Sequence, residues 1–508
     1  MKSQIPDTSK IGKLYLLNGE VKTWEGSTTP ITSPICYRDI APDSEDGTTL
    51  DTRVYLGEIP NMTEEHAMVA LDAAVSAWDK GKGEWPSMPI QARIEATRKF
   101  VSILKEQRSE VIQLLMWEIG KSYKDSIKEF DRTIDYINDT LDALAVIDSE
   151  NRCTREYDGI AAQILRTPLG VCLSMGPFNY PLNETYTTLI PALVMGNTLV
   201  VKPPKYGVLL HQPILKAFAE AFPPGVVNFI YGDGATIISP IMKSGKIDVL
   251  AFIGSCKVAD ILKKQHPHPH RLRCILGLDA KNPAIILPDA DLEHAAKECI
   301  TGALSFNGQR CTALKILFVH ESIAAEFVAK VSDGVQKLKK GLPWDEDVQI
   351  TPLAEENKVE KLQELIQDAI CKGAHIVNAE GGTNKNTLVH PAVMFPTSAD
   401  AKLYTVEQFG PIIPICTYKS TEEFLDFVVN SNFGQQISIF GNDQINIRRL
   451  TSELINQVSR ININSQCQRG PDILPFTGRK DSAEGTLSIT DALRCFSIRA
   501  VIAKKANS

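Results

Sequence analysis

The stretch GVCLSMGPFNYPLNETYTTLIPALVMGNTLVVKPP, residues 170–204, decides the fold. It begins with a short run of β-favouring residues that stops at the turn-forming sequence GPFNYP. An apolar helix candidate follows, and TLVVK then has the pattern of a second strand, which two prolines end. Strand, turn, helix and strand in this order predict a parallel βαβ unit, because two parallel strands need a long crossover between them.

The same alternation continues toward the C-terminus. GVVNFIYG and VLAFIGS are further strand candidates, and QPILKAFAEAF has helical spacing. After a break near residue 280, NPAIILPDADLEHAAKECITGALSF begins a second series that continues to ISIFGN. Short apolar strands alternating with amphipathic helices predict doubly wound sheets, in which ligands bind beyond the carboxyl ends of the strands. Two remote segments, GIAAQILRTP and RCFSIRAVIAK, look like strands outside both sheets, a pattern typical of an oligomerisation element.

Composition excludes several classes of partner. A chain of 508 residues is too long for one core, and a net charge of −7 argues against binding nucleic acid. The most apolar stretch, residues 187–202, falls short of the roughly 18 unbroken apolar residues of a membrane span. The N-terminus lacks the pattern of a signal peptide, and eleven scattered cysteines indicate reduced thiols, so we expect a cytoplasmic protein. The run HPHPH lacks a zinc-ligand framework, and we expect no metal.

The sequence SFNGQRCTALK, residues 305–315, holds the candidate nucleophile. A cysteine becomes nucleophilic when nearby positive charge favours its thiolate. Arg310 supplies a charge directly before Cys311, and Gly308 permits a close backbone approach. Asn179, at the end of a predicted strand, could direct its amide at a developing oxyanion. Taken alone, a cysteine such as Cys311 is more often a buried, inert thiol than a nucleophile.

The motifs GPFNYPLNE, VKPP, FIGS, FNGQRCT and EQFGPIIP occur in the order and spacing of the aldehyde dehydrogenase superfamily. The resemblance extends over nearly the whole chain. GQRCTALK, QRGPDILPF and KSYKDSIKEFDRT resemble in particular its NADP-dependent, non-phosphorylating glyceraldehyde-3-phosphate dehydrogenases.

This resemblance implies two doubly wound α/β domains and a small β oligomerisation element. Residues 1–148 and 168–278 would form the cofactor-binding domain, and residues 279–487 the catalytic domain. Residues 149–167 and 488–508 would supply strands that assemble a homodimer or homotetramer.

The resemblance also implies a reaction. Cys311 would attack the aldehyde carbon to form a thiohemiacetal, while Asn179 and the Cys311 backbone N–H hold the oxyanion. Loss of a hydride to the nicotinamide would leave a thioester that water cleaves, converting D-glyceraldehyde 3-phosphate to 3-phosphoglycerate.

Four residues indicate the substrate class. The resembling group binds the substrate phosphate at positions that correspond here to Arg132, Tyr180, Arg310 and Arg469. A single arginine is more often a surface residue or a structural ion-pair partner. Three arginines and a tyrosine at all four positions indicate a small phosphorylated, or at least anionic, aldehyde.

One residue indicates the cofactor. Lys205 stands where NAD-preferring relatives often have a glutamate, and a lysine should attract a 2′-phosphate. We therefore expect NADP, with NAD as the alternative. The resemblance implies further cofactor contacts at Phe178, Lys202, Gly232, Ser255, Glu407 and Phe409.

One position departs from the family pattern. The family usually carries ELGGK, whose glutamate activates the deacylating water, whereas this chain has GLDAK with Gly277 at that place. Asp279 could act as the base instead only if the local strand pleat places its side chain on the same face of the strand as residue 277.

Three hypotheses remain from the sequence. They are a hydrolytic NADP-dependent oxidation, an acylating dehydrogenase that passes the acyl group to coenzyme A or another acceptor, and a catalytically silent nucleotide-binding scaffold.

Overall fold

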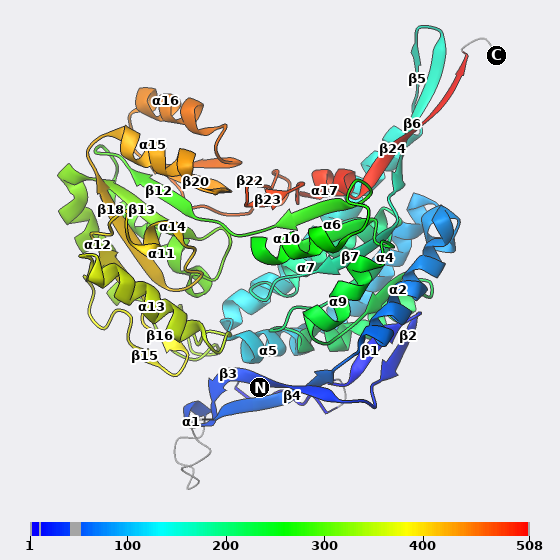
Figure 1. Cartoon of the computed structure of the whole chain (residues 1–508), viewed down its shortest axis with the longest axis horizontal. Coiled ribbons are helices and arrows are strands. Elements are labelled where there is room, and N and C mark those ends of the chain that lie inside the picture. The colour runs from blue at the N-terminus through cyan, green and yellow to red at the C-terminus, as the bar shows by residue number, and fades with distance from the viewer. Residues whose placement is uncertain (1–2, 10–11, 41–51, 506–508) are drawn as a thin grey trace.

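The computed structural model describes residues 3–9, 12–40 and 52–505. Two α/β lobes, each built on a large sheet, stand side by side, and a narrow three-stranded arm projects from one end (Figure 1). The predicted fold class, two doubly wound α/β units with a separate small β element, is confirmed.

The first sheet has eight strands in the order β2-β1-β9-β8-β7-β10-β11-β23. Strands β7 to β11 run parallel to one another, whereas β1 pairs antiparallel with β9 and β23 antiparallel with β11. Every residue of β7 and β10 is buried, which explains their continuous apolar sequences. The strands are β1 (Leu14–Leu17), β2 (Glu20–Thr23), β7 (Val171–Met175), β8 (Thr198–Lys202), β9 (Val227–Phe229), β10 (Val249–Ile253), β11 (Arg273–Gly277) and β23 (Ala483–Glu484).

Eight helices of this lobe surround that sheet: α2 (Glu64–Trp78), α4 (Ile90–Glu106), α5 (Arg108–Ile119), α6 (Tyr123–Asn151), α7 (Asn183–Val194), α8 (Leu215–Ala221), α9 (Gly234–Lys243) and α10 (Cys256–Gln265). Residues 110–137 have helical apolar spacing, but the helix is broken between α5 and α6. Gly120 adopts a left-handed conformation with φ of 68°, which ends α5.

The second sheet has seven strands in the order β14-β17-β18-β13-β12-β20-β21, parallel except for β14. Its strands are β12 (Asn282–Ile286), β13 (Leu314–His320), β14 (His375–Ile376), β17 (Ala392–Phe395), β18 (Ile412–Tyr418), β20 (Gln436–Phe440) and β21 (Arg460–Ile463). The helices of this lobe are α11 (Leu292–Leu304), α12 (Ala324–Gln336), α13 (Lys358–Cys371), α14 (Lys402–Thr405), α15 (Thr421–Asn430) and α16 (Gln444–Leu454). Nowhere in the described chain is a helix long and apolar enough to cross a membrane.

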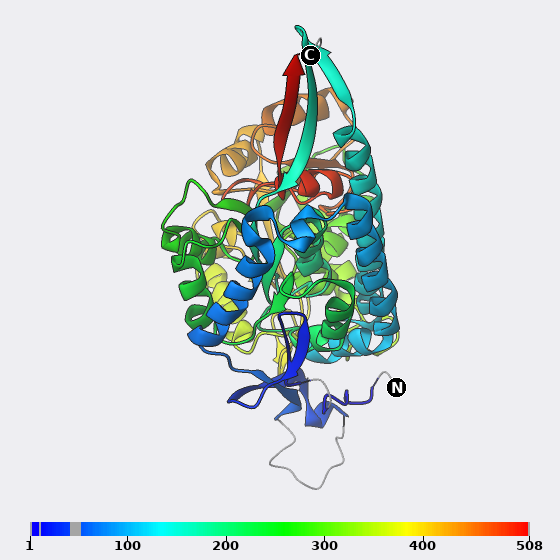
Figure 2. The same ribbon diagram turned by 90° about the vertical axis from the view of Figure 1, so that its right-hand side faces the viewer.

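The arm consists of β5 (Thr154–Tyr157), β6 (Ile160–Pro168) and β24 (Ser497–Lys505). β24 pairs antiparallel with β6 along its whole length, so two segments far apart in the sequence form one ribbon (Figure 2). Both segments lie outside the two large sheets, as expected. Their role in oligomerisation stays a prediction.

The C-terminal part of the chain differs in two details from the expected division. β23 lies within residues 279–487 but pairs antiparallel with β11 of the first sheet. Residues 488–508, expected to supply a strand, begin with a helix, α17 (Ile489–Cys495), before β24 starts. Near the N-terminus, β3 (Thr28–Cys36) and β4 (Arg53–Pro60) form a separate two-stranded sheet.

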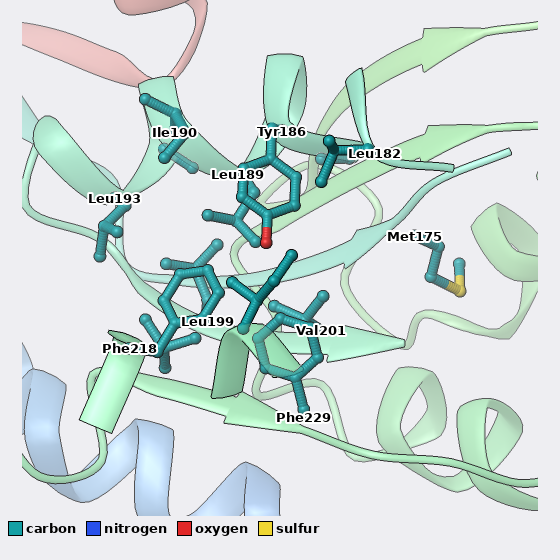
Figure 3. Close-up of a cluster of buried hydrophobic side chains, with 14 of the residues drawn as sticks. Met175, Leu182, Tyr186, Leu189, Ile190, Leu193, Leu199, Val201, Phe218 and Phe229 are labelled. Carbon is teal, nitrogen blue, oxygen red and sulfur yellow. The ribbon is translucent and has the colours of Figure 1, made fainter. Parts of the chain in front are cut away.

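Helix α7, which follows the GPFNYP turn, is buried along its whole length. Its Tyr186 and Leu189 lie over β8 and β9, next to Phe218 and Phe229 (Figure 3). Burying a large apolar side chain stabilises a fold by about 1.5–3 kcal/mol. This packing fixes α7 against the sheet, and so fixes both ends of the turn that carries Asn179.

Candidate active site

A cavity of about 930 Å³ is lined by residues from both lobes. Met175, Lys202, Ile253 and Gly277, the last residues of four parallel strands, lie on its wall. The cavity therefore occupies the place predicted for a ligand in such sheets. All but one of the predicted site residues line it: Arg132, Phe178, Asn179, Tyr180, Lys202, Lys205, Ser255, Arg310, Cys311, Glu407, Phe409 and Arg469.

Gly232 is the exception. It has a φ of +138°, and a Cβ atom there would lie 3.0 Å from the backbone oxygen of Met62. Gly232 is thus needed for a close approach to a neighbouring segment. Gly232 is not among the described residues that line the cavity, whereas Gly234, the first residue of α9, is.

Cys311 follows a strained turn. Phe306, Asn307 and Gly308 have φ values of 48°, 58° and 71°. A Cβ atom on Gly308 would lie 2.7 Å from the backbone oxygens of Ala303 and Gly410, so only glycine fits. Residues in such conformations persist where the surrounding structure holds them, often at functional sites. Here the turn presents Cys311 to the cavity.

The charges around Cys311 differ from the sequence expectation. The pKa of its thiol is raised to about 11, chiefly by burial and also by the Glu184 carboxylate, while Arg469 and Lys315 oppose this shift. Arg310 directs its guanidinium back to α11, where Nη2 donates to the Gly302 carbonyl at 2.8 Å. The cations that favour the thiolate are therefore Arg469, which is remote in the sequence, and Lys315 on β13, not the adjacent Arg310.

The raised pKa of Cys311 predicts how its reaction rate with an alkylating reagent depends on pH. Alkylation of Cys311 by iodoacetamide in the protein without ligands should accelerate about tenfold per pH unit between about pH 7 and 10, because only the thiolate reacts. Mass spectrometry of the peptide that contains Cys311 measures the rate. An ordinary thiol has a pKa of about 8.5. An alkylation rate that stops rising near pH 8.5 would therefore contradict the raised pKa of Cys311.

Asn179 is held from two sides. Its side-chain Nδ2 donates to the Gln309 carbonyl at 2.8 Å, two residues before Cys311. Its backbone oxygen accepts a hydrogen bond from Lys121 Nζ at 2.7 Å. Lys121 is fully buried and forms an ion pair with Glu129. Sequence reasoning missed this lysine, although its place directly after the helix-ending Gly120 marked a break in a helical pattern.

The predicted phosphate-binding residues lie together, but two of the arginines already have carboxylate partners. Arg132 forms a two-pronged ion pair with Asp472, at 2.9 and 2.6 Å. Arg469 forms an ion pair with Glu184 and lies 3.5 Å from Asp472. The sequence analysis assigned no role to Glu184 or Asp472.

The predicted cofactor residues lie along the other part of the wall. Phe178 and Phe409 approach edge to face with centroids 5.8 Å apart. Glu407 forms an ion pair at 3.1 Å with the buried Lys315, a residue missed from sequence. Burial raises the pKa of the Glu407 carboxyl, while Lys315 opposes that shift. Lys205 is exposed at the end of the β8 segment, where a charged group of a ligand could reach it.

Comparison with known proteins identifies the family. The model of the aldehyde dehydrogenase family matches residues 48–501. The chain belongs to the aldehyde dehydrogenase family. It is therefore placed among oxidoreductases that act on aldehydes, as the motifs predicted.

Several named members of the aldehyde dehydrogenase family are similar over most of their length. An NADP-dependent glyceraldehyde-3-phosphate dehydrogenase from Streptococcus equinus is 33% identical over 440 residues, which cover 85% of this chain and 90% of that protein. A lactaldehyde dehydrogenase from Methanococcus aeolicus is 30% identical over 444 residues, covering 86% and 92%. The solved structure of an NADP-dependent glyceraldehyde-3-phosphate dehydrogenase from Bacillus halodurans, complexed with NADP, matches with a TM-score of 0.88 and 31% identity, covering 98% of this chain and 100% of that chain.

Gly277 is the position where this aldehyde dehydrogenase departs from the motif of its family. A Cβ atom there would meet Ile253 at 3.4 Å and Leu487 at 3.7 Å, so apolar side chains surround the place of the expected base. The Asp279 carboxylate accepts the backbone N–H of Cys256 at 2.8 Å, at the first turn of α10. Asp279 thus caps a helix on the cofactor side, which argues against it as the replacement base.

Proposed function

We propose that this chain oxidises a small phosphorylated aldehyde with NADP, and that D-glyceraldehyde 3-phosphate, giving 3-phosphoglycerate, is the first substrate to test. The observation that carries the proposal is the shared cavity. It brings the candidate nucleophile Cys311, the amide of Asn179 and the cationic group of Arg132, Arg310 and Arg469 to one space. The named glyceraldehyde-3-phosphate dehydrogenases among the relatives support the same substrate class.

The residues of the site act in a defined order of chemical steps. After Cys311 loses its proton, Sγ forms a bond to the aldehyde carbon, and the carbonyl oxygen takes up the negative charge. Asn179 Nδ2 uses one N–H on the Gln309 carbonyl, which leaves the second for this oxyanion. NADP, when bound, would accept the hydride that leaves this carbon, so that the carbonyl re-forms as a thioester on Cys311. Water then adds to the thioester carbon, the carbon–sulfur bond breaks, and the thiolate returns to Cys311.

The cavity fits the proposed cofactor. Lys202 and Lys205 follow β8, and Ser255 caps α10, where backbone N–H groups favour anions. The Phe178 and Phe409 rings provide flat apolar surfaces between this region and Cys311. We infer that NADP lies along this wall with its 2′-phosphate toward Lys205.

Reversal of the charge at position 205 tests the cofactor assignment. Lys205→Glu should lower the ratio of kcat/KM for NADP over NAD by about 30-fold or more, because an attraction of roughly 1 kcal/mol becomes a repulsion of similar size. Steady-state kinetics with both cofactors measure the ratio. Lys216→Glu is the matched control, since Lys216 is an exposed lysine outside the cavity. An equal change in both variants would contradict a contact at Lys205.

One assay tests the proposed function. The full-length protein is mixed with glyceraldehyde 3-phosphate and NADP, without inorganic phosphate or coenzyme A, and NADPH absorbance is followed. Sustained turnover supports hydrolytic oxidation. Absence of NADPH formation, with NADP still bound, would overturn the proposal and leave a nucleotide-binding scaffold.

Acyl transfer to a thiol or phosphate is the second candidate function. The apolar surroundings of Gly277 favour it, because a positioned base ordinarily contributes about 10²–10⁴-fold to such a step. In the same assay this function gives a burst of NADPH equal to the enzyme concentration, and added coenzyme A or phosphate restores turnover.

A further inference from the structure

Four charged residues form a row with alternating sign beside Cys311. Glu184 pairs with Arg469, Arg469 Nε lies 3.5 Å from Asp472, and Asp472 holds Arg132 through two hydrogen bonds. The row joins α7, the loop after β21 and α6. Its two carboxylates balance its two guanidinium groups, so its formal charge is zero.

The carboxylates use the donors that a phosphate would need. Arg469 directs Nη1 to Glu184 and Nη2 to the Leu487 carbonyl at 3.0 Å. Arg132 directs both Nε and Nη2 to Asp472. A dianionic group that enters this end of the cavity therefore has to compete with carboxylates already bound to these arginines.

The two carboxylates are placed differently. Asp472 contacts both arginines and is not among the described residues that line the cavity, so it belongs to the scaffold of the row. Glu184 lines the cavity. Within the described residues its only ion pair is with Arg469. Glu184 is thus the carboxylate that shares space with a ligand.

Arg310 completes this end of the cavity. Its Nη2 donates to the Gly302 carbonyl, and its buried Nε has no hydrogen-bond partner among the described residues. Arg310 therefore keeps a donor for a substrate. Arg469 also has a buried Nε without a hydrogen-bond partner among the described residues, but its Nη1 and Nη2 are engaged by Glu184 and the Leu487 carbonyl.

We propose that Glu184 is a specificity-determining residue that competes with the substrate phosphate for Arg469. This inference rests on the proposed function, in that it requires the cavity to oxidise small aldehydes. The Glu184 carboxylate takes the place of an anion on Arg469 and repels a phosphate, while it can accept hydrogen bonds from the hydroxyl groups of unphosphorylated aldehydes. It shifts the preference of the site from phosphorylated toward unphosphorylated hydroxyaldehydes.

Glu184→Gln tests the competition with little change in shape, because the glutamine oxygen can still accept a hydrogen bond from Arg469. The ratio of kcat/KM for glyceraldehyde 3-phosphate over glyceraldehyde should rise about tenfold or more, since juxtaposed like charges discriminate strongly at such sites. Asp125→Asn is the matched control. Asp125 also lines the cavity, but its carboxylate accepts a hydrogen bond from the Ser122 hydroxyl at 2.9 Å instead of binding Arg469.

A binding measurement provides a readout that does not depend on turnover. Inorganic phosphate should raise the Tm of the Glu184→Gln protein more than that of the wild type or of Asp125→Asn, because a ligand stabilises the state that binds it. Tm also shows whether each variant folds. An unchanged substrate ratio and an unchanged phosphate effect in a folded Glu184→Gln protein would overturn the inference.

The outcomes separate this inference from the proposed function. If the wild type oxidises only unphosphorylated aldehydes and Glu184→Gln gains the phosphorylated one, the inference holds and the proposed substrate is wrong. If the wild type oxidises glyceraldehyde 3-phosphate and the ratio does not move in Glu184→Gln, the function holds and the inference is wrong.

Discussion

Cys311→Ser should abolish the formation of NADPH from any aldehyde, with a loss on the order of 10⁴-fold or more, the scale seen when a covalent nucleophile is removed. The serine hydroxyl is far less acidic than a thiol, and the cations that favour the thiolate, Arg469 and Lys315, do not compensate for that difference. Rapid mixing with NADP and glyceraldehyde 3-phosphate should show neither a burst nor steady turnover.

Two controls sharpen this result. NADP affinity, followed by quenching of protein fluorescence, should be retained in Cys311→Ser, because the predicted cofactor contacts lie on other residues. Cys371→Ser removes an exposed thiol of α13 outside the cavity and should leave the activity intact. Activity that survives in Cys311→Ser would remove this cysteine from the mechanism.

The sequence was informative wherever function depends on local pattern. The strands β7, β8 and β10 end close to where the apolar runs end, so Asn179, Lys202 and Ser255 could be placed at one sheet edge without coordinates. Gly308 in FNGQRC indicated a tight turn, and the structure shows why glycine is required there.

The charge near Cys311 depends on ion pairs between segments that are far apart in the sequence, and no local sequence pattern encodes such pairs. Glu184 and Arg469 are 285 positions apart, and Arg132 and Asp472 are 340 positions apart. A prediction of these pairs requires the packing of α6, α7 and the loop after β21, which periodicity does not supply. For the same reason Arg310 looked like the activating charge next to Cys311, whereas its side chain turns to the end of α11.

Gly277→Glu should accelerate deacylation with water about 10²-fold or more, toward the scale of a positioned general base. A Cβ atom at residue 277 would fit, since it would be in ordinary contact with Ile253 and Leu487 at 3.4 Å and 3.7 Å, and residue 277 lines the cavity into which the side chain would extend. Burial beside these apolar groups should raise the pKa of the new carboxyl toward neutrality, where a general base is most effective. If the wild type gives only a burst of NADPH, as acyl transfer predicts, Gly277→Glu should convert that burst to sustained turnover without an added acceptor.

Gly277→Gln is the matched control, because it fills the same space without a basic group. The glutamine variant should keep the burst and the slow turnover, so a gain shared by both variants would show that volume, not base strength, changed the rate. A wild type that already turns over steadily, with no gain in Gly277→Glu, would show that another group activates the water. The comparison thus separates an enzyme that has lost its base from one that has replaced it, and hence hydrolysis from acyl transfer as the way the acyl group leaves Cys311.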